Sequence, residues 1–181
     1  MKRLLLITSI FLALSSNTTG NTDINQIGNS NIKKGSSWVD GSVPITLISN
    51  VNRQAEAWGF CSATWTVMAN LPESTPAQST LNNQFSNGAK VALAMTYIAD
   101  LSDDFDPKEL KSTWIFAKTV MESIPEVQLN WIMADLEEKG ADTWVDDLIA
   151  TKQVCEDNLD GQQMYVDLWR GLATSGLLEF K

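Results

Sequence analysis

Apolar residues recur at steps of three and four along most of the chain after residue 50, which is the pattern of helices that bury one face. The first such segment begins at Val51, because Asn50 is a suitable cap for a helix N-terminus. It ends at Leu71-Pro72, since the residue before a proline avoids the helical conformation. The residues on its apolar face are Trp58, Cys61, Trp65 and Met68.

The following segments carry recognisable helix start signals. "TPAQ" at 75–78 combines a Thr cap, Pro at the first helical position and Gln three residues after the cap. "DPKE" at 106–109 repeats the arrangement with an Asp cap and a Glu. "SIPE" at 123–126 has the same order, so we expect Pro125 to begin a separate helix, which ends at Gly140.

Two more helices complete the pattern. Asp142 is the expected cap of the fifth helix, and the sixth is expected to begin within 160–163. The expected buried residues are Trp144, Leu148, Cys155 and Leu159 in the fifth helix, and Tyr165, Leu168, Trp169 and Leu172 in the sixth. Short connections and the lack of a convincing strand predict an all-α fold, a single-domain bundle of about six helices over residues 50–181.

The first 49 residues have a different character. Residues 1–16 contain Lys2 and Arg3, the apolar run "LLLITSIFLAL" and small residues after it, which is the pattern of a secretory signal peptide. The apolar run is shorter than the about 20 residues of a membrane-spanning helix, so we expect no stable membrane insertion after cleavage. Residues 17–49 are rich in Asn, Ser and Gly and predict a flexible polar linker or an extended arm. The expected location is periplasmic or secreted.

The chain has two cysteines, Cys61 and Cys155. In an exported protein this number predicts one intramolecular disulfide, here linking the first helix to the fifth. Two free thiols, or a bridge to another chain, are the alternatives.

The charge balance is strongly acidic, with 13 basic and 22 acidic residues. Removal of the signal peptide takes away Lys2 and Arg3 and leaves a balance of −11. Such a surface repels nucleic acid and anionic membranes and attracts a basic protein partner. Solubility alone is the competing explanation for the same charge.

The chain contains no histidine, which excludes Ser–His–Asp and Cys–His sites and the usual zinc sites. It has no Gly-x-Gly nucleotide fingerprint either, so we expect no cofactor and no metal. Carboxylate chemistry remains open, and Glu56 and Glu122 are the candidates within amphipathic helices. Trp131 stands beside an apolar face and is the candidate for a partly exposed aromatic. The acids of 100–109 suit calcium, but their spacing is not that of an EF-hand.

Together these features indicate an exported, non-enzymatic helical binding protein with an acidic surface, whose partner is another protein. One alternative is a carboxylate-dependent enzyme that acts on glycans. The other is a carrier of a small apolar ligand, which requires an enclosed cavity between the helices.

Overall fold

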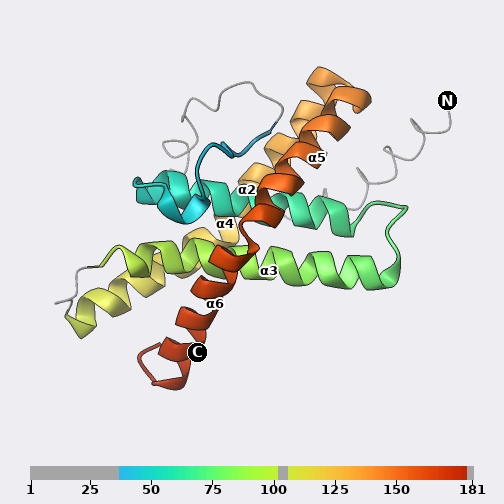
Figure 1. Ribbon diagram of the computed structural model, residues 1–181. Helices are drawn as coiled ribbons and strands as arrows, with labels where there is room; N and C mark the ends of the chain where they lie inside the picture. The colour runs from blue at the N-terminus through green and yellow to red at the C-terminus, as the bar shows by residue number, and fades with distance from the viewer. Residues whose placement is uncertain (1–36, 102–105, 179–181) are drawn as a thin grey trace.

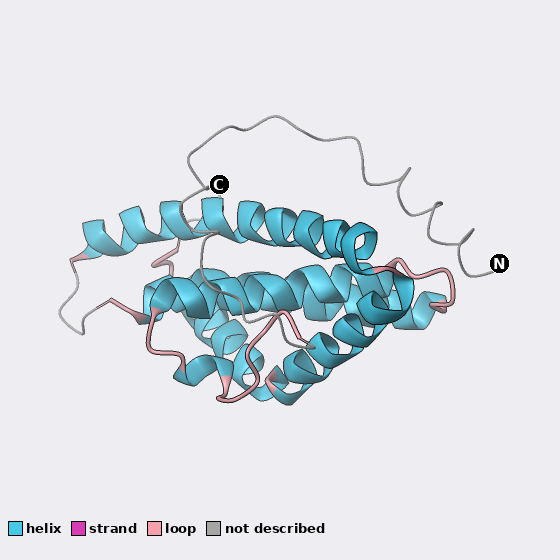
Figure 2. Cartoon of the chain, turned by 90° about the horizontal axis from the view of Figure 1, so that it is seen from above, coloured by secondary structure: helices cyan, strands magenta, loops and turns pink. Residues whose placement is uncertain are grey.

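The computed structural model describes residues 37–101 and 106–178, and this part of the chain is helical with no strand. A short 3-10 helix, η2 (Ile45–Leu47), precedes five α-helices. These are α2 (Val51–Ala69), α3 (Pro76–Ala99), α4 (Pro107–Lys139), α5 (Ala141–Asp157) and α6 (Leu159–Thr174). The predicted all-α fold is therefore confirmed, and Figure 2 shows the described part of the chain as helices and loops only. The predicted signal peptide, 1–16, lies outside the described residues.

The number of helices was predicted wrongly, because α4 continues through Pro125. The hydroxyl of Ser123 donates to the carbonyl oxygen of Thr119, at 3.0 Å, and does not cap a new helix. Buried residues recur at every fourth position on both sides of Pro125, so both halves of α4 pack on the same neighbours. This packing offsets the backbone hydrogen bond that a proline cannot donate. The residues that carry this period are Val120, Ile124, Gln128, Ile132 and Leu136.

The other start signals mostly act as expected. Asn50 accepts a hydrogen bond from the backbone N–H of Arg53, and Thr75 forms a reciprocal capping box with Gln78. Asp106 accepts from the N–H of Lys108 at the start of α4. The predicted cap of the fifth helix is wrong, because α5 already begins at Ala141 and Asp142 lies in its first turn.

The helices α2 and α3 form the centre of the molecule, and α4 packs against both of them (Figure 1). The segments α5 and α6 follow one another with only Asn158 between them. In Figure 1, α6 crosses α3 and then extends beyond it. Leu168, which was expected to be buried, is 40% exposed, and the buried residues of α6 are Gln162 and Tyr165.

Most of the tryptophans belong to the core. Trp58 and Trp65 on α2 are fully buried, and Trp114 and Trp144 are nearly so.

No described helix is both long enough and apolar enough to cross a membrane.

The segment before α2 packs against the helices. The backbone N–H of Trp38 donates to Oγ1 of Thr151 on α5 at 2.9 Å, and the N–H of Ile45 donates to Oδ1 of Asn158 at 2.8 Å. The carbonyl oxygen of Ile45 accepts from Nε2 of Gln54 on α2 at 3.0 Å. The side chains of Trp38 and Ile45 are buried. Residues 37–48 therefore form an arm that packs on α2, α4 and α5.

Candidate functional site

The two cysteines form the predicted intramolecular disulfide. The sulfur atoms of Cys61 and Cys155 are 2.02 Å apart, and the Cα atoms are 5.5 Å apart. The bond joins α2 to α5, so the pairing is confirmed. The numbering of the second helix was wrong, since α5 is the fourth α-helix of the described part of the chain.

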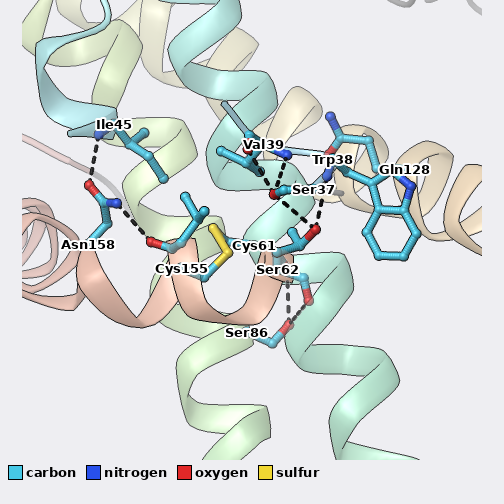
Figure 3. The surroundings of a disulfide bond; sticks show 12 residues. Ser37, Trp38, Val39, Ile45, Cys61, Ser62, Ser86, Gln128, Cys155 and Asn158 are labelled. Carbon is cyan, nitrogen blue, oxygen red and sulfur yellow. Dashed lines mark hydrogen bonds between the residues drawn. A yellow bond between two sulfur atoms is a disulfide. The ribbon is translucent and has the colours of Figure 1, made fainter. Parts of the chain in front are cut away.

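The disulfide is buried and shielded from solvent. Both cysteines are buried, and Figure 3 shows the arm residues Ser37, Val39 and Ile45 around them. Neither sulfur is a free thiol. The role of this bond is therefore to hold α5 against the centre of the bundle, and the pair offers no nucleophile.

Glu56 lies half-buried on α2, beside polar groups of α3 and α4. Its backbone oxygen accepts a hydrogen bond from Nε2 of Gln128 at 2.9 Å. Burial, and secondly the negative charge of Glu56, raise the pKa of the Tyr97 phenol to about 12. The neutral Tyr97 hydroxyl donates to Oδ1 of Asn52 at 3.2 Å. The Glu56 carboxylate therefore acts on Tyr97 of α3, while Gln128 of α4 holds the Glu56 backbone.

Glu122 is placed differently. Its side chain is 69% exposed and lies 3.8 Å from Nζ of Lys90 on α3. Glu122 precedes Trp131 by nine residues, about two and a half helical turns, so the two residues lie on opposite sides of α4. The recorded partner of the Glu122 carboxylate is therefore Lys90, whereas the charge of Glu56 acts on Tyr97.

Trp131 is 39% exposed and packs on α2. Its ring centroid is 6.3 Å from that of Phe60, in a tilted arrangement. Phe60 follows Glu56 by four residues, so both lie on the same side of α2. Glu56 therefore shares its side of α2 with Phe60, the residue whose ring Trp131 contacts.

The described residues contain no group of three or more acidic or cysteine side chains that could hold a metal ion. The acidic segment considered for calcium, 100–109, falls partly outside the described residues, since 102–105 are not described. Asp106 and Glu109, which are described, lie at the start of α4, where the helix dipole favours acids.

A stretch rich in acidic residues, 135–147, forms the tip of the α4–α5 hairpin. The chain reverses at Gly140, whose φ of 79° suits glycine. This stretch of 13 residues has six acids and one base, Lys139. Nζ of Lys139 donates to Asp135 at 2.6 Å and to Asp147 at 2.8 Å. Burial lowers the pKa of Lys139, but these two hydrogen bonds outweigh it and raise the pKa above its usual value.

Asp147 is a buried acid within this stretch. Its side chain is only 8% exposed, because it points to Lys139 beneath the hairpin. Asp135 also accepts from Nε1 of Trp38 at 2.7 Å. The hairpin tip is therefore tied to the arm by the same carboxylate that binds its only lysine.

The outward side of α5 combines acids with apolar residues. Asp142 and Asp146 are exposed, and Val145 and Ile149 are 42% and 57% exposed. Lys152 on the same helix lies beside Glu156, with its Nζ 5.6 Å from the centroid of the Trp65 ring. This combined face was not predicted from the sequence. The available signal was that Val145 and Ile149 are four residues apart and lie on a different side of the helix from Trp144 and Leu148.

Comparison with known proteins adds no relative. No protein-family model matches the chain, and searches of curated proteins and of solved structures find no similar protein or fold.

Proposed function

We propose that this protein is an exported, non-enzymatic binding protein that recognises a basic partner protein through the tip of its α4–α5 hairpin. The signal-like N-terminus supports export. The Cys61–Cys155 bond supports it as well, because disulfides persist in oxidising compartments such as the periplasm and the extracellular space.

The observation that carries the proposal is the charge of the hairpin tip. Six acids stand within residues 135–147, and the single cation, Lys139, is held by two of them. Glu137, Glu138, Asp142 and Asp146 are exposed there. A concentrated negative field of this kind raises the association rate of a positively charged protein and sets its orientation.

The hairpin is also held in a fixed geometry. Nε1 of Trp144 at the start of α5 donates to the backbone oxygen of Ile132 on α4 at 2.6 Å. The disulfide fixes the far end of α5 to α2, and Trp38 binds the α4 side through Asp135. A surface that is already ordered loses less conformational entropy on binding than a flexible one.

A capture experiment from the native envelope fraction tests the function. The wild-type protein is immobilised beside an Asp142→Lys/Asp146→Lys variant and a control variant, Glu73→Lys/Glu126→Lys. The control changes the net charge equally, at exposed acids outside the hairpin tip. We expect wild type and control to retain the same basic protein at low salt, and the hairpin variant to lose it.

The salt dependence gives the second readout. Retention should fall as salt rises, because exposed charges more than about 10 Å apart are screened at 0.1 M ionic strength. Capture of no protein by the wild type contradicts the proposal. Equal loss in both charge-reversed variants contradicts the placement of the site at the hairpin tip.

A further inference from the structure

We infer that the partner docks a basic amphipathic helix along the outer side of α5, an inference that rests on the proposed function and names the element that the partner presents. The residues of this surface, called here the α5 docking face, are Asp142, Val145, Asp146, Ile149 and Gln153.

The spacing of the α5 docking face is that of a helix–helix seam. Asp142, Val145, Asp146 and Ile149 stand at i, i+3, i+4 and i+7, so they form one continuous strip along the helix. Val145 and Ile149, one turn apart, give the strip an apolar ridge that the described residues leave partly open, since the two side chains are 42% and 57% exposed. Amphipathic helices dock onto such ridges through their own residues at i, i+3, i+4 and i+7.

The charge around the ridge selects the kind of helix. Asp142 and Asp146 border the ridge, and neither cation of this region is directed to it: Lys139 binds Asp135 and Asp147, and Lys152 lies beside Glu156. An occupant must therefore supply both an apolar stripe and flanking Lys or Arg side chains.

The same charges argue against the other occupants of an apolar ridge. A second copy of this chain docked face to face would oppose Asp142 and Asp146 with their own copies. An anionic lipid surface would be repelled in the same way. The face extends from residue 142 to residue 153, about 17 Å along the axis, so it accommodates about three turns of a partner helix.

Two synthetic peptides of identical composition test the inference. Each has about 18 residues of lysine and leucine, enough for about five turns of helix. In the first peptide the leucines form one stripe, and in the second they are shuffled so that no stripe forms. Binding of each labelled peptide to the full-length disulfide-bonded protein is measured by fluorescence anisotropy. We expect the amphipathic peptide to bind at least about tenfold more tightly, because only it buries apolar surface on the ridge.

Paired variants locate the site. Val145→Ser/Ile149→Ser should reduce the affinity for the amphipathic peptide to that of the shuffled one. The control Leu81→Ser/Ile115→Ser removes apolar side chains that are 47% and 59% exposed on α3 and α4, and should keep the preference. Circular dichroism of both variants confirms that the helices are retained.

The outcomes separate this inference from the proposed function. Equal, salt-sensitive binding of both peptides by the wild type overturns the helix-docking inference and leaves the basic-partner proposal standing. Equal loss in the control pair also overturns it. Binding of neither peptide overturns the inference too, whereas the proposed function depends separately on capture of a basic protein from the envelope fraction.

Discussion

The side chain of Gln128 on α4 lies directly over Gly59 on α2. A Cβ atom on Gly59 would be 2.2 Å from Oε1 of Gln128 and 2.6 Å from Cγ2 of Ile124. Nε2 of the same glutamine donates to the backbone oxygen of Glu56. Gly59 is therefore the position that lets α4 approach α2 closely enough for a buried side chain to bind the α2 backbone. A Cβ atom on Gly88 of α3 would likewise lie 2.3 Å from Nε2 of Gln162 on α6.

Substitution Gly59→Ala should destabilise the protein by about 1–3 kcal/mol, because overpacking forces two buried helices apart. Gly171→Ala is the matched control, since a Cβ there has no atom within 4 Å. It should stabilise α6 by roughly 0.5–1 kcal/mol through lower backbone entropy of the unfolded chain. Urea unfolding measures both changes, and an unchanged midpoint for Gly59→Ala would contradict the close contact.

Removal of the disulfide by Cys61→Ala/Cys155→Ala should lower the free energy of unfolding by about 2–5 kcal/mol. The bond closes a separation of 94 residues, so its loss greatly increases the freedom of the unfolded chain. The measurement is urea unfolding of the oxidised wild type and the double variant. Thiol labelling of the denatured, non-reduced wild type should find no free thiol, and two labelled cysteines would refute the pairing.

Release of the arm should expose the disulfide. Thr151→Val removes the acceptor of the Trp38 N–H and the contact to Ser37, so we expect faster reduction by dithiothreitol under native conditions. Thr119→Val is the control, because the Thr119 hydroxyl also donates to the carbonyl four residues earlier in its own helix, but at an exposed position of α4. Equal reduction rates in wild type and Thr151→Val would show that the arm does not shield the bond.

Loss of Lys139 should leave Asp147 buried without its cation. We expect Lys139→Met to cost roughly 1–3 kcal/mol, a figure reduced for the partial solvent exposure of the pair. The double variant Lys139→Met/Asp147→Leu should recover part of that loss, because it removes the unpaired buried charge. A double-mutant cycle from urea unfolding gives the coupling between the two side chains, and additive effects would contradict a direct interaction.

Alkaline pH should destabilise the fold through its two tyrosines, Tyr97 and Tyr165. Burial raises the pKa of both phenols, that of Tyr97 from 10.0 to about 12. The unfolded chain loses these protons first, so the stabilising contribution is complete below pH 10 and is lost as the pH rises through the folded pKa. Tyrosinate absorbance of the native protein should therefore rise above pH 10, later than that of the urea-unfolded protein.

The charge of Glu56 is the second cause of the Tyr97 shift, so Glu56→Gln should lower the pKa of this tyrosine and leave that of Tyr165 unchanged. The same spectrophotometric titration measures this. A native titration curve that coincides with the unfolded one would contradict the burial of both rings.

The sequence by itself determined which segments become helices and where several of them begin. The side chains of Asn50, Thr75 and Asp106 cap their helices by accepting hydrogen bonds from backbone N–H groups two or three residues later. Such local bonds do not depend on contacts with other helices. The sequence also predicted the pairing of the cysteines, because only two are present, and the structure confirms that pairing. The burial of Trp58 and Trp65 follows from their helical spacing in the same way.

Tertiary packing decided what local signals left open. The "SIPE" segment has a valid start pattern, but α4 continues through Pro125 because neighbouring helices bury both halves of one apolar face. Asp147 is buried because Lys139, on another helix, lies within hydrogen-bond distance. Leu168 is 40% exposed because the side of α6 that packs on the bundle buries Gln162 and Tyr165 instead. The α5 docking face arises likewise, since helical spacing groups its residues while packing decides which side of α5 stays uncovered.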